Sequence, residues 1–364
     1  MNWKIYKPLA ILVVGVGIVP ILTSLTGSNF YLTQLTMTAY YLLVALGLCV
    51  LMGYTGQVSM GQAGFFAIGG YTSAYLTTLN LAAYSGRPFV HFLSSLGILK
   101  GGKDLYEKEI LYLSPWIGLL AAILLSVSIA YLIGIPVLKL KGHYLVMATM
   151  SVGVVIEVLV KGSRVFGGAD GLSNVPPFQL FPGISVDGEV QNRVMNYFIA
   201  WIIVVLGLLV LINLIHSKVG RALRSLHDNE EASNAMGIDT ARYKLKVFIL
   251  GAVFSAVAGV FLTHFNASIG PGEASVMKSV RYVSIVAIGG MANIWGTLVM
   301  GLSLIFLSLR GVFGSYDDAV FGAILILIMI FTPEGLLKKQ VRNRRQKIDP
   351  LTQAASHDEQ EKTR

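Results

Sequence analysis

The stretch GRALRSLHDNEEASNAMGID, residues 220–239, is a charged segment in a chain of 364 residues that is 54% hydrophobic and only 13% charged. On each side of it lies an apolar run long enough to cross the hydrocarbon core of a bilayer, which is about 30 Å thick. A linker between two membrane helices needs only a few residues. The length and polarity of this segment therefore indicate a role of its own between two spans.

Apolar blocks of about 20 residues recur along the chain and predict an all-α, polytopic integral membrane protein of about 8 transmembrane helices. We expect residues 1–335 to form one transmembrane domain and residues 336–364 to form a tail that is first basic and then polar. The predicted spans are residues 8–26, 31–52, 62–80, 115–138, 143–160, 195–216, 247–268 and 318–332.

Basic residues fix the expected orientation of these spans. Lys4 and Lys7 place the N-terminus in the cytoplasm, because loops on that side of a membrane carry an excess of Lys and Arg. By the same rule the tail and the loop at 217–246 are cytoplasmic, and the formal charge of +9 reflects membrane topology, with no nucleic-acid partner. The basic residues of the loop are Lys218, Arg221, Arg224, Arg242, Lys244 and Lys246.

A glycine-rich break interrupts the late apolar segment 282–309. GGMANIWG, residues 289–296, disfavours a continuous helix. A re-entrant segment that turns here and leaves on the side it entered would place the tail in the cytoplasm, whereas the alternative is one long, tilted helix with another span misjudged. Because broken helices at membrane depth often mark the substrate path of transporters, Gly289 and Gly290 are candidates for such a path.

A second glycine-rich stretch, GYTGQVSMGQAGFFAIGGY at residues 53–71, lies in the other half of the chain. Its polar residues Gln57, Ser59 and Gln62 stand between apolar flanks with no charge nearby, so they are also candidates for the path. The two broken stretches, one in each half, suggest an internal structural repeat.

The sequence offers little for chemistry. It contains no HExxH, GxSxG or paired-cysteine motif, so we expect no catalytic residue, no metal and no cofactor. Glu157 is the one notable acidic residue within a predicted span, and Lys161 follows it at helical spacing. The two form either an interfacial ion pair or a polar lining of the path near its outer mouth.

The segment 220–239 itself has the pattern of two short helices. Leu223 and Leu226 recur at helix spacing, Asn229 offers a break, and Gly237 suits the position just after a helix C-terminus. Such a pair of helices on the cytoplasmic face could dock into a groove of a soluble partner. The alternative is a solvated loop without a partner.

These stretches have counterparts in a known family. In GRALRSLHDNEEASNAMGID, the residues Glu230, Glu231 and Ala232 resemble the Glu-Ala element of the coupling loop of ABC importer permeases, and Gly237 resembles its glycine. The stretch 53–71, KGHYLVMATMSVGVVIEVL with FGGADGL, and VAIGGMANIWGTLVMG are similar to further segments of the branched-chain amino-acid permeases, the M-type subunit in particular. The chain departs from that family at Lys141 and His143, where Arg and Asp are frequent.

The resemblance implies a permease subunit of an ATP-driven importer for branched-chain or similar small amino acids, in a bacterial or archaeal inner membrane. Its implied partners are ABC ATPase subunits, a second permease of the H-type, a periplasmic or lipid-anchored substrate-binding protein, and membrane lipid. The ATPase would drive alternating access by docking on 220–239, with Gly220 and Arg221 contributing, while Thr149 would join the pathway candidates. Urea, amides or small carboxylates are alternative substrates, and an ion-coupled secondary transporter is the alternative class.

Overall fold

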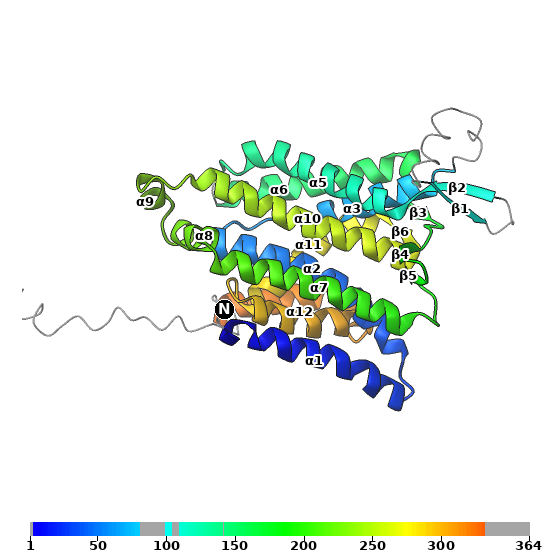
Figure 1. Cartoon of the computed structure of the whole chain (residues 1–364). Helices are drawn as coiled ribbons and strands as arrows, with labels where there is room; N and C mark the ends of the chain where they lie inside the picture. Colours follow the sequence, from blue (N-terminus) through cyan, green and yellow to red (C-terminus); the bar gives the residue numbers. More distant parts are fainter. Residues whose placement is uncertain (1–2, 81–98, 104–108, 141, 332–364) are drawn as a thin grey trace, which may run out of the picture.

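The computed structural model is a bundle of long helices that lie side by side (Figure 1). It describes residues 3–80, 99–103, 109–140 and 142–331, so the expected tail at 336–364 lies outside the described residues. The helices are α1 (Trp3–Leu25), α2 (Phe30–Thr55), α3 (Gln62–Thr78), α5 (Pro115–Val137), α6 (His143–Gly162), α7 (Arg193–His216), α8 (Lys218–Asp228), α9 (Glu230–Ala235), α10 (Thr240–Asn266), α11 (Val276–Gly289), α12 (Ile294–Leu309) and α13 (Asp317–Phe331).

The predicted all-α, polytopic membrane fold is confirmed. A helix lies at every predicted span, and six of the described helices are long and apolar enough to cross a membrane: α1, α2, α5, α6, α7 and α10. The helix α3 is shorter than these six helices. The residues that precede it, 56–61, are not helical, so the helix begins only at Gln62. The strands of the described residues form short antiparallel pairs, which are β1 (Leu99–Lys103) with β2 (Glu109–Leu113), β3 (Leu172–Ser173) with β6 (Ser268–Ile269), and β4 (Phe178–Phe181) with β5 (Ile184–Val186).

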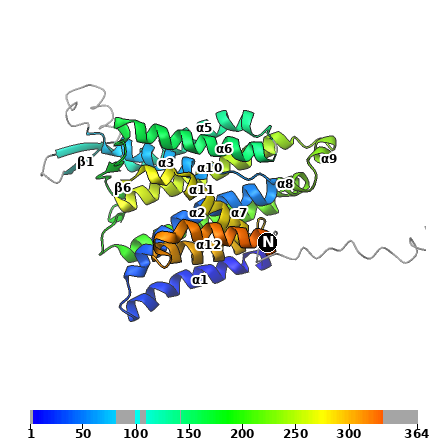
Figure 2. The same cartoon turned by 180° about the vertical axis from the view of Figure 1, so that it is seen from behind.

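The two ends of the bundle differ. All of these strands gather at one end, the strand end, whereas α8 and α9 project from the other, the α8–α9 end, where the N-terminus also lies (Figures 1 and 2). The N-terminus and the segment 220–239 therefore share one side, as the distribution of basic residues predicts.

The start of α10 differs from the predicted span at 247–268. The helix begins at Thr240, because the Asp239 carboxylate caps it by accepting a hydrogen bond of 3.1 Å from the backbone N–H of Arg242. The basic side chains of Arg242, Lys244 and Lys246 thus stand on the first turns of α10. The connection between α7 and α10 therefore ends at Asp239 and is shorter than the predicted loop at 217–246.

Helices α11 and α12 form a hairpin, which confirms the predicted break. Gly290 ends α11 with a φ of +97°, and α12 begins at Ile294. The tip of the hairpin packs against the last turn of α2, where a Cβ on Gly53 would overlap the carbonyl oxygen of Met291. The open ends of both arms lie toward the strand end (Figure 2). There Arg281 of α11 and Ser308 of α12 contact Asp317 of α13. The alternative of one long helix is wrong.

Helix directions show an inverted relationship between two series of helices. The series α2, α3, α5 and α6 and the series α10, α11, α12 and α13 each alternate in direction along the bundle, and corresponding members run opposite ways (Figures 1 and 2). In each series a long α-helix is followed by a segment that is not α-helical and then by a shorter α-helix. The two glycine-rich stretches on which the repeat was suggested do not correspond in this relationship, because the break in 53–71 lies between the first and second helices of one series and 289–296 between the second and third of the other. Inverted repeats with broken helices are common in transporters.

Candidate functional site

The segment 220–239 folds into two short helices for reasons that are visible in the sequence. Ser217 caps α8, since its hydroxyl accepts hydrogen bonds from the backbone N–H groups of Val219 and Gly220. Leu223 and Leu226 then fall on the buried face of this helix. That face packs on α2, α7 and α10, so α8 is held firmly against the bundle.

The second short helix, α9, begins and ends where the sequence predicts. Asn229 caps it by accepting a hydrogen bond of 3.0 Å from the N–H of Ala232, and Gly237 follows its end with a φ of +81°. The hydroxyls of Ser225 and Ser233 lie 2.8 Å apart and join the two helices. The helix–turn–helix interpretation of this segment is confirmed as a structure.

Four of the six residues assigned to docking on this segment are exposed: Arg221, Glu231, Ala232 and Gly237. Gly220 is buried instead and lies so close to the preceding turn that a Cβ there would overlap the carbonyl oxygen of Ile215. Glu230 is turned toward α10, where it forms an ion pair of 2.6 Å with the buried Lys244.

A docking candidate that sequence reasoning missed is Met236, whose surface is 70% exposed. It follows α9 directly, between Ala235 and Gly237. A large exposed apolar side chain beside charged residues is typical of a protein-binding surface. The signal was present in the sequence, since Met236 is apolar within a polar segment. We call the exposed set Arg221, Glu231, Ala232, Met236 and Gly237 the loop surface.

The inner side of α8 contacts the point at which α2 breaks. Gly56 ends α2 in the left-handed region, with a φ of +66°, and a Cβ on it would lie 3.2 Å from Nδ1 of His227 in α8. The non-helical residues 56–61 begin at this contact and lead inward to α3. A movement of α8 would therefore reach this segment directly.

Polar candidates from the early glycine-rich stretch come together along this segment. Gln57, Ser59 and Gln62 are all buried, and Thr149 of α6 joins them, since its hydroxyl accepts a hydrogen bond of 3.1 Å from the N–H of Met60. These residues line the non-helical segment, where irregular backbone within a membrane protein must be surrounded by protein or water.

The break is connected to both later helices. Ser255 of α10 donates a hydrogen bond of 2.8 Å to Oε1 of Gln62, and Ser279 of α11 accepts one of 3.2 Å from the N–H of Ala63. The side-chain nitrogens of Gln57 and Gln62 are buried, and neither has a hydrogen-bond partner among the residues that the structure describes. Unsatisfied amide groups at the buried start of a helix offer donors to a polar solute.

The remaining pathway candidates lie elsewhere. Glu157 forms an ion pair of 2.5 Å with Lys161, and its side chain is 18% exposed, so the ion-pair interpretation holds for this residue. Gly289 and Gly290 lie at the hairpin tip, where a Cβ on Gly289 would come within 2.5 Å of the backbone nitrogen of Thr297. These glycines permit the tight turn and are separate from the residues around Gln62.

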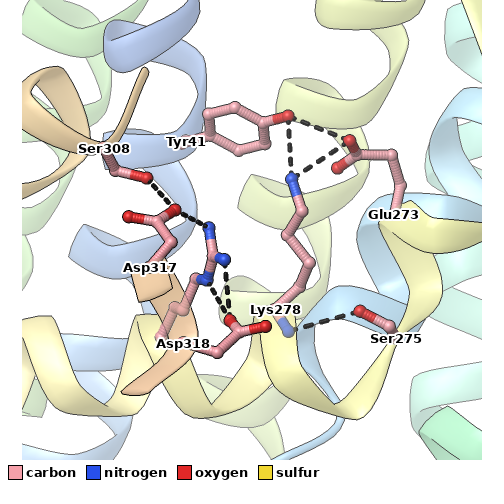
Figure 3. Close-up of polar contacts among 8 residues, drawn as sticks. Tyr41, Glu273, Ser275, Lys278, Ser308, Asp317 and Asp318 are labelled. Carbon is pink, nitrogen blue, oxygen red and sulfur yellow. Dashed lines mark hydrogen bonds and ion pairs between the residues drawn. The ribbon is translucent and has the colours of Figure 1, made fainter. Parts of the chain in front are cut away.

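A network of polar and charged groups that sequence reasoning missed joins five segments at the strand end: α2, the turn at Pro271–Ala274, α11, α12 and α13 (Figure 3). The hydroxyl of Tyr41 in α2 donates to Glu273, and the ammonium of Lys278 in α11 donates to both, over 3.2 and 3.1 Å. Arg281 of α11 pairs with Asp317 over 2.9 Å and with Asp318 over 2.7 Å, both from α13.

This network anchors the hairpin to its surroundings. Ser308 at the end of α12 donates to the carboxylate of Asp317 (Figure 3). The ion pairs are partly buried, and each side chain of Lys278, Glu273, Arg281 and Asp317 is 19% to 26% exposed. Its members are far apart in sequence, so only the fold reveals it.

The described residues contain no group of three or more His, Cys, Asp or Glu side chains placed to hold a metal ion. What the structure does contain is a helical membrane bundle with a broken helix in its interior and two short helices held against one end. Discontinuous helices of this kind are common in membrane transport proteins and indicate that class.

Comparison with known proteins identifies the family. A family described as "Branched-chain amino acid transport system / permease component" matches residues 30–329. The chain belongs to this family, and the resemblance found in its motifs is confirmed.

Individual relatives support the same family assignment. The chain is 28% identical over 323 residues to the high-affinity branched-chain amino acid transport system permease protein LivM of Escherichia coli, a match that covers 83% of this chain and 68% of LivM. To LivH of the same organism it is 26% identical over 317 residues, which covers 83% of this chain and 92% of LivH. A probable LivM of Methanocaldococcus jannaschii is 24% identical over 330 residues, covering 82% and 91% of the two chains. No solved structure matches.

Proposed function

We propose that this chain is the membrane-spanning permease subunit of an ATP-driven importer for branched-chain or similar small amino acids, and that a separate ATPase docks on the loop surface. The observation that carries this proposal is the two-sided placement of α8. Arg221 on the outer side of α8 is exposed, as are Glu231 and Met236, which follow this helix in the chain. The inner side of α8 contacts Gly56, where α2 ends and the non-helical segment begins. Force applied to the loop surface would thus act on the broken helix.

The proposed function also implies the partners of the chain and its orientation in the membrane. The loop surface and the N-terminus face the cytoplasm, where the ATPase subunits bind and hydrolyse ATP; the chain itself is not an enzyme. A second permease of the H-type completes the passage, since relatives named LivM and LivH both match this chain. A periplasmic or lipid-anchored binding protein delivers the substrate at the strand end.

Within the permease, we assign the substrate path to the buried residues around the break. Gln57, Ser59, Gln62 and Thr149 supply polar groups there. The unpaired side-chain nitrogens of the two glutamines are suited to donate hydrogen bonds to a carboxylate or an amide oxygen. Alternating access exposes this region first to the strand end and then to the α8–α9 end. The same donors would also serve urea, amides or small carboxylates as substrates.

An ion-coupled secondary transporter is the rival function. It needs an acidic group that binds the driving ion within the membrane. Glu157 is committed to Lys161, which favours a structural role for this carboxylate. Uptake by the reconstituted complex that needs ATP on the loop side, and persists without an ion gradient, supports the importer. Uptake that follows the gradient and ignores ATP contradicts it.

Docking is tested by crosslinking in the complete complex. The chain has a single cysteine, Cys49, which is buried, so Met236→Cys adds one accessible thiol. A photoactivatable crosslinker on this thiol should join the permease to the ATPase. The control is Val312→Cys at the strand end, where the side chain is 60% exposed and no ATPase adduct is expected. If only the control gives the adduct, the loop surface is not the docking site.

A further inference from the structure

A pocket of about 480 Å³ lies beside the loop surface, between α5, α9 and the first turns of α10. Its volume falls within the range of ligand sites, roughly 300–1,000 Å³. Nothing in the proposed transport function uses this pocket, since the broken segment and its polar groups are elsewhere. Its lining has two distinct parts, one apolar and one charged.

The apolar part is formed by Ile135 of α5, by Leu138, which directly follows α5, and by Leu245 of α10. Beside them α5 and α10 touch at Gly134, where a Cβ would lie 2.6 Å from the side chain of Leu245. Ile135 is 44% exposed, and the preceding Leu132 is 74% exposed. The apolar wall is therefore continuous with the outer apolar face of α5, which in a membrane protein meets the hydrocarbon.

The charged part lies toward the α8–α9 end. It contains Lys139, Arg242 and Lys244 together with Glu230 and Asp239. Lys244 pairs with Glu230 over 2.6 Å, and Arg242 pairs with Asp239 over 2.7 Å. Lys139 forms no ion pair within the part of the chain that the structure describes, so the rim has one positive charge in excess. The side chain of Arg242 is 81% exposed, so its guanidinium can turn toward an anion.

We propose that this pocket binds an anionic phospholipid. The phosphate of the headgroup lies between Lys139 and Arg242, and an acyl chain runs along Ile135, Leu138 and Leu245. Basic pockets between membrane helices at the cytoplasmic side suit such headgroups, because the positive charges and the hydrocarbon wall meet at the depth of the lipid phosphate. A soluble anion would use the basic rim but would gain nothing from the apolar wall.

The bound lipid also contacts α9, the helix that carries Glu231 and Ala232 of the loop surface. Glu230 and Asn234 of α9 line the same pocket, and the Glu230–Lys244 ion pair forms part of its wall. A lipid in this place fills the space between α5 and α9 and restrains α9. The lipid is thus a structural ligand of the helix pair, whether or not an ATPase docks there.

The test is lipid binding to the purified transporter complex, measured by native mass spectrometry with dioleoyl phosphatidylglycerol and dioleoyl phosphatidylcholine. We expect selective binding of the phosphatidylglycerol. Lys139→Ala and Arg242→Ala should each weaken it about fivefold, the size of effect of one basic residue near an anionic lipid surface. Ile135→Trp, which fills the apolar part without changing charge, should weaken it as well.

The matched control is Lys246→Ala. Lys246 is an exposed cation on the same helix, but it does not line the pocket, so binding should be unchanged. If Lys139→Ala and Lys246→Ala weaken lipid binding equally, the lipid responds to the general positive charge of this face and not to the pocket. That result would overturn the proposal. So would equal binding of the two lipids, or displacement of phosphatidylglycerol by millimolar inorganic phosphate, which would indicate a soluble anion.

Discussion

The ammonium group of Lys244 lies 2.6 Å from the carboxylate of Glu230 and ties the first turn of α10 to α9. The lysine side chain is 8% exposed and the glutamate 29% exposed, so neither is well solvated. A buried charge that loses its partner is costly, whereas the intact pair is nearly neutral in free energy. This ion pair therefore controls how firmly α9 is held.

We expect Glu230→Gln to lower the free energy of unfolding by about 1–3 kcal/mol, because a charge-assisted hydrogen bond to a poorly solvated ammonium is weakened. Lys244→Met should have an effect in the same direction. The double variant should be less destabilised than the sum of the two single variants, which thermal unfolding of the purified protein in detergent would measure. Strict additivity would show that the two side chains do not stabilise each other.

Glu231 differs from Glu230 in that its side chain is exposed on the loop surface. Glu231→Lys should leave the protein in the membrane, yet it should abolish uptake and ATPase association, because it reverses a charge on the docking surface. Glu189→Lys is the matched control, since Glu189 is exposed at the strand end. Co-purification of the ATPase is the measurement, and normal uptake by Glu231→Lys would make the segment a linker after all.

Gly237→Asp should also abolish uptake while the protein stays in the membrane, but here the backbone contributes to the effect. Gly237 has a φ of +81°, a conformation that L-residues adopt at a cost, with Asn and Asp among the more tolerant. Gly237→Asn keeps the same conformation without a charge. If Asn restores uptake, the docking surface excludes an added charge, and if both variants fail, the glycine conformation itself is required.

Local signals explain why the segment 220–239 was predictable and its surroundings were not. Asn229 and Gly237 act within a few residues, so their capping roles can be seen in the sequence. The start of α10 was placed too late because Arg242, Lys244 and Lys246 have the composition of a loop, whereas Asp239 caps a helix that contains them.

Contacts between distant segments had no signal in the sequence. Gly56 and His227 meet only because α8 folds back against the end of α2. The same holds for Arg281 and its two aspartates on α13. The glycine-rich breaks were predictable as breaks, but the side chains that surround them come from α6, α10 and α11.

The hairpin of α11 and α12 depends on the missing side chain at Gly289. A Cβ there would lie 2.5 Å from the backbone nitrogen of Thr297, so we expect Gly289→Ala to destabilise the protein by about 1–3 kcal/mol through overpacking. Gly322→Ala in α13 is the control, because nothing lies within 4 Å of its added Cβ. Equal thermal unfolding of both variants would mean that the hairpin adjusts without cost.

The proposed path predicts a specific role for Gln62. Gln62→Leu removes the buried side-chain amide. The oxygen of this amide accepts a hydrogen bond from Ser255, and its nitrogen is available to a solute. We expect the maximal uptake rate to fall at least about tenfold, the effect of losing one hydrogen bond worth about 1.4 kcal/mol in the transport barrier. The control is Ser126→Ala, since Ser126 is a buried, unpaired hydroxyl on α5. A change in thermal stability without a change in uptake would make Gln62 a packing residue only.

Asp317 and Asp318 both pair with Arg281, but they should not contribute equally. The side chain of Asp317 is 19% exposed and also accepts from Ser308, whereas that of Asp318 is 49% exposed. Asp317→Ala should therefore cost about 2 kcal/mol of stability, and Asp318→Ala less than about 1 kcal/mol, because solvent screens the more exposed pair. Thermal unfolding at low and high salt separates the two, since only the Asp318 effect should shrink as salt rises. Asp170→Ala, an exposed carboxylate outside the network, is the control. A larger loss for Asp318→Ala would mean that its two hydrogen bonds to the guanidinium outweigh burial in anchoring the hairpin.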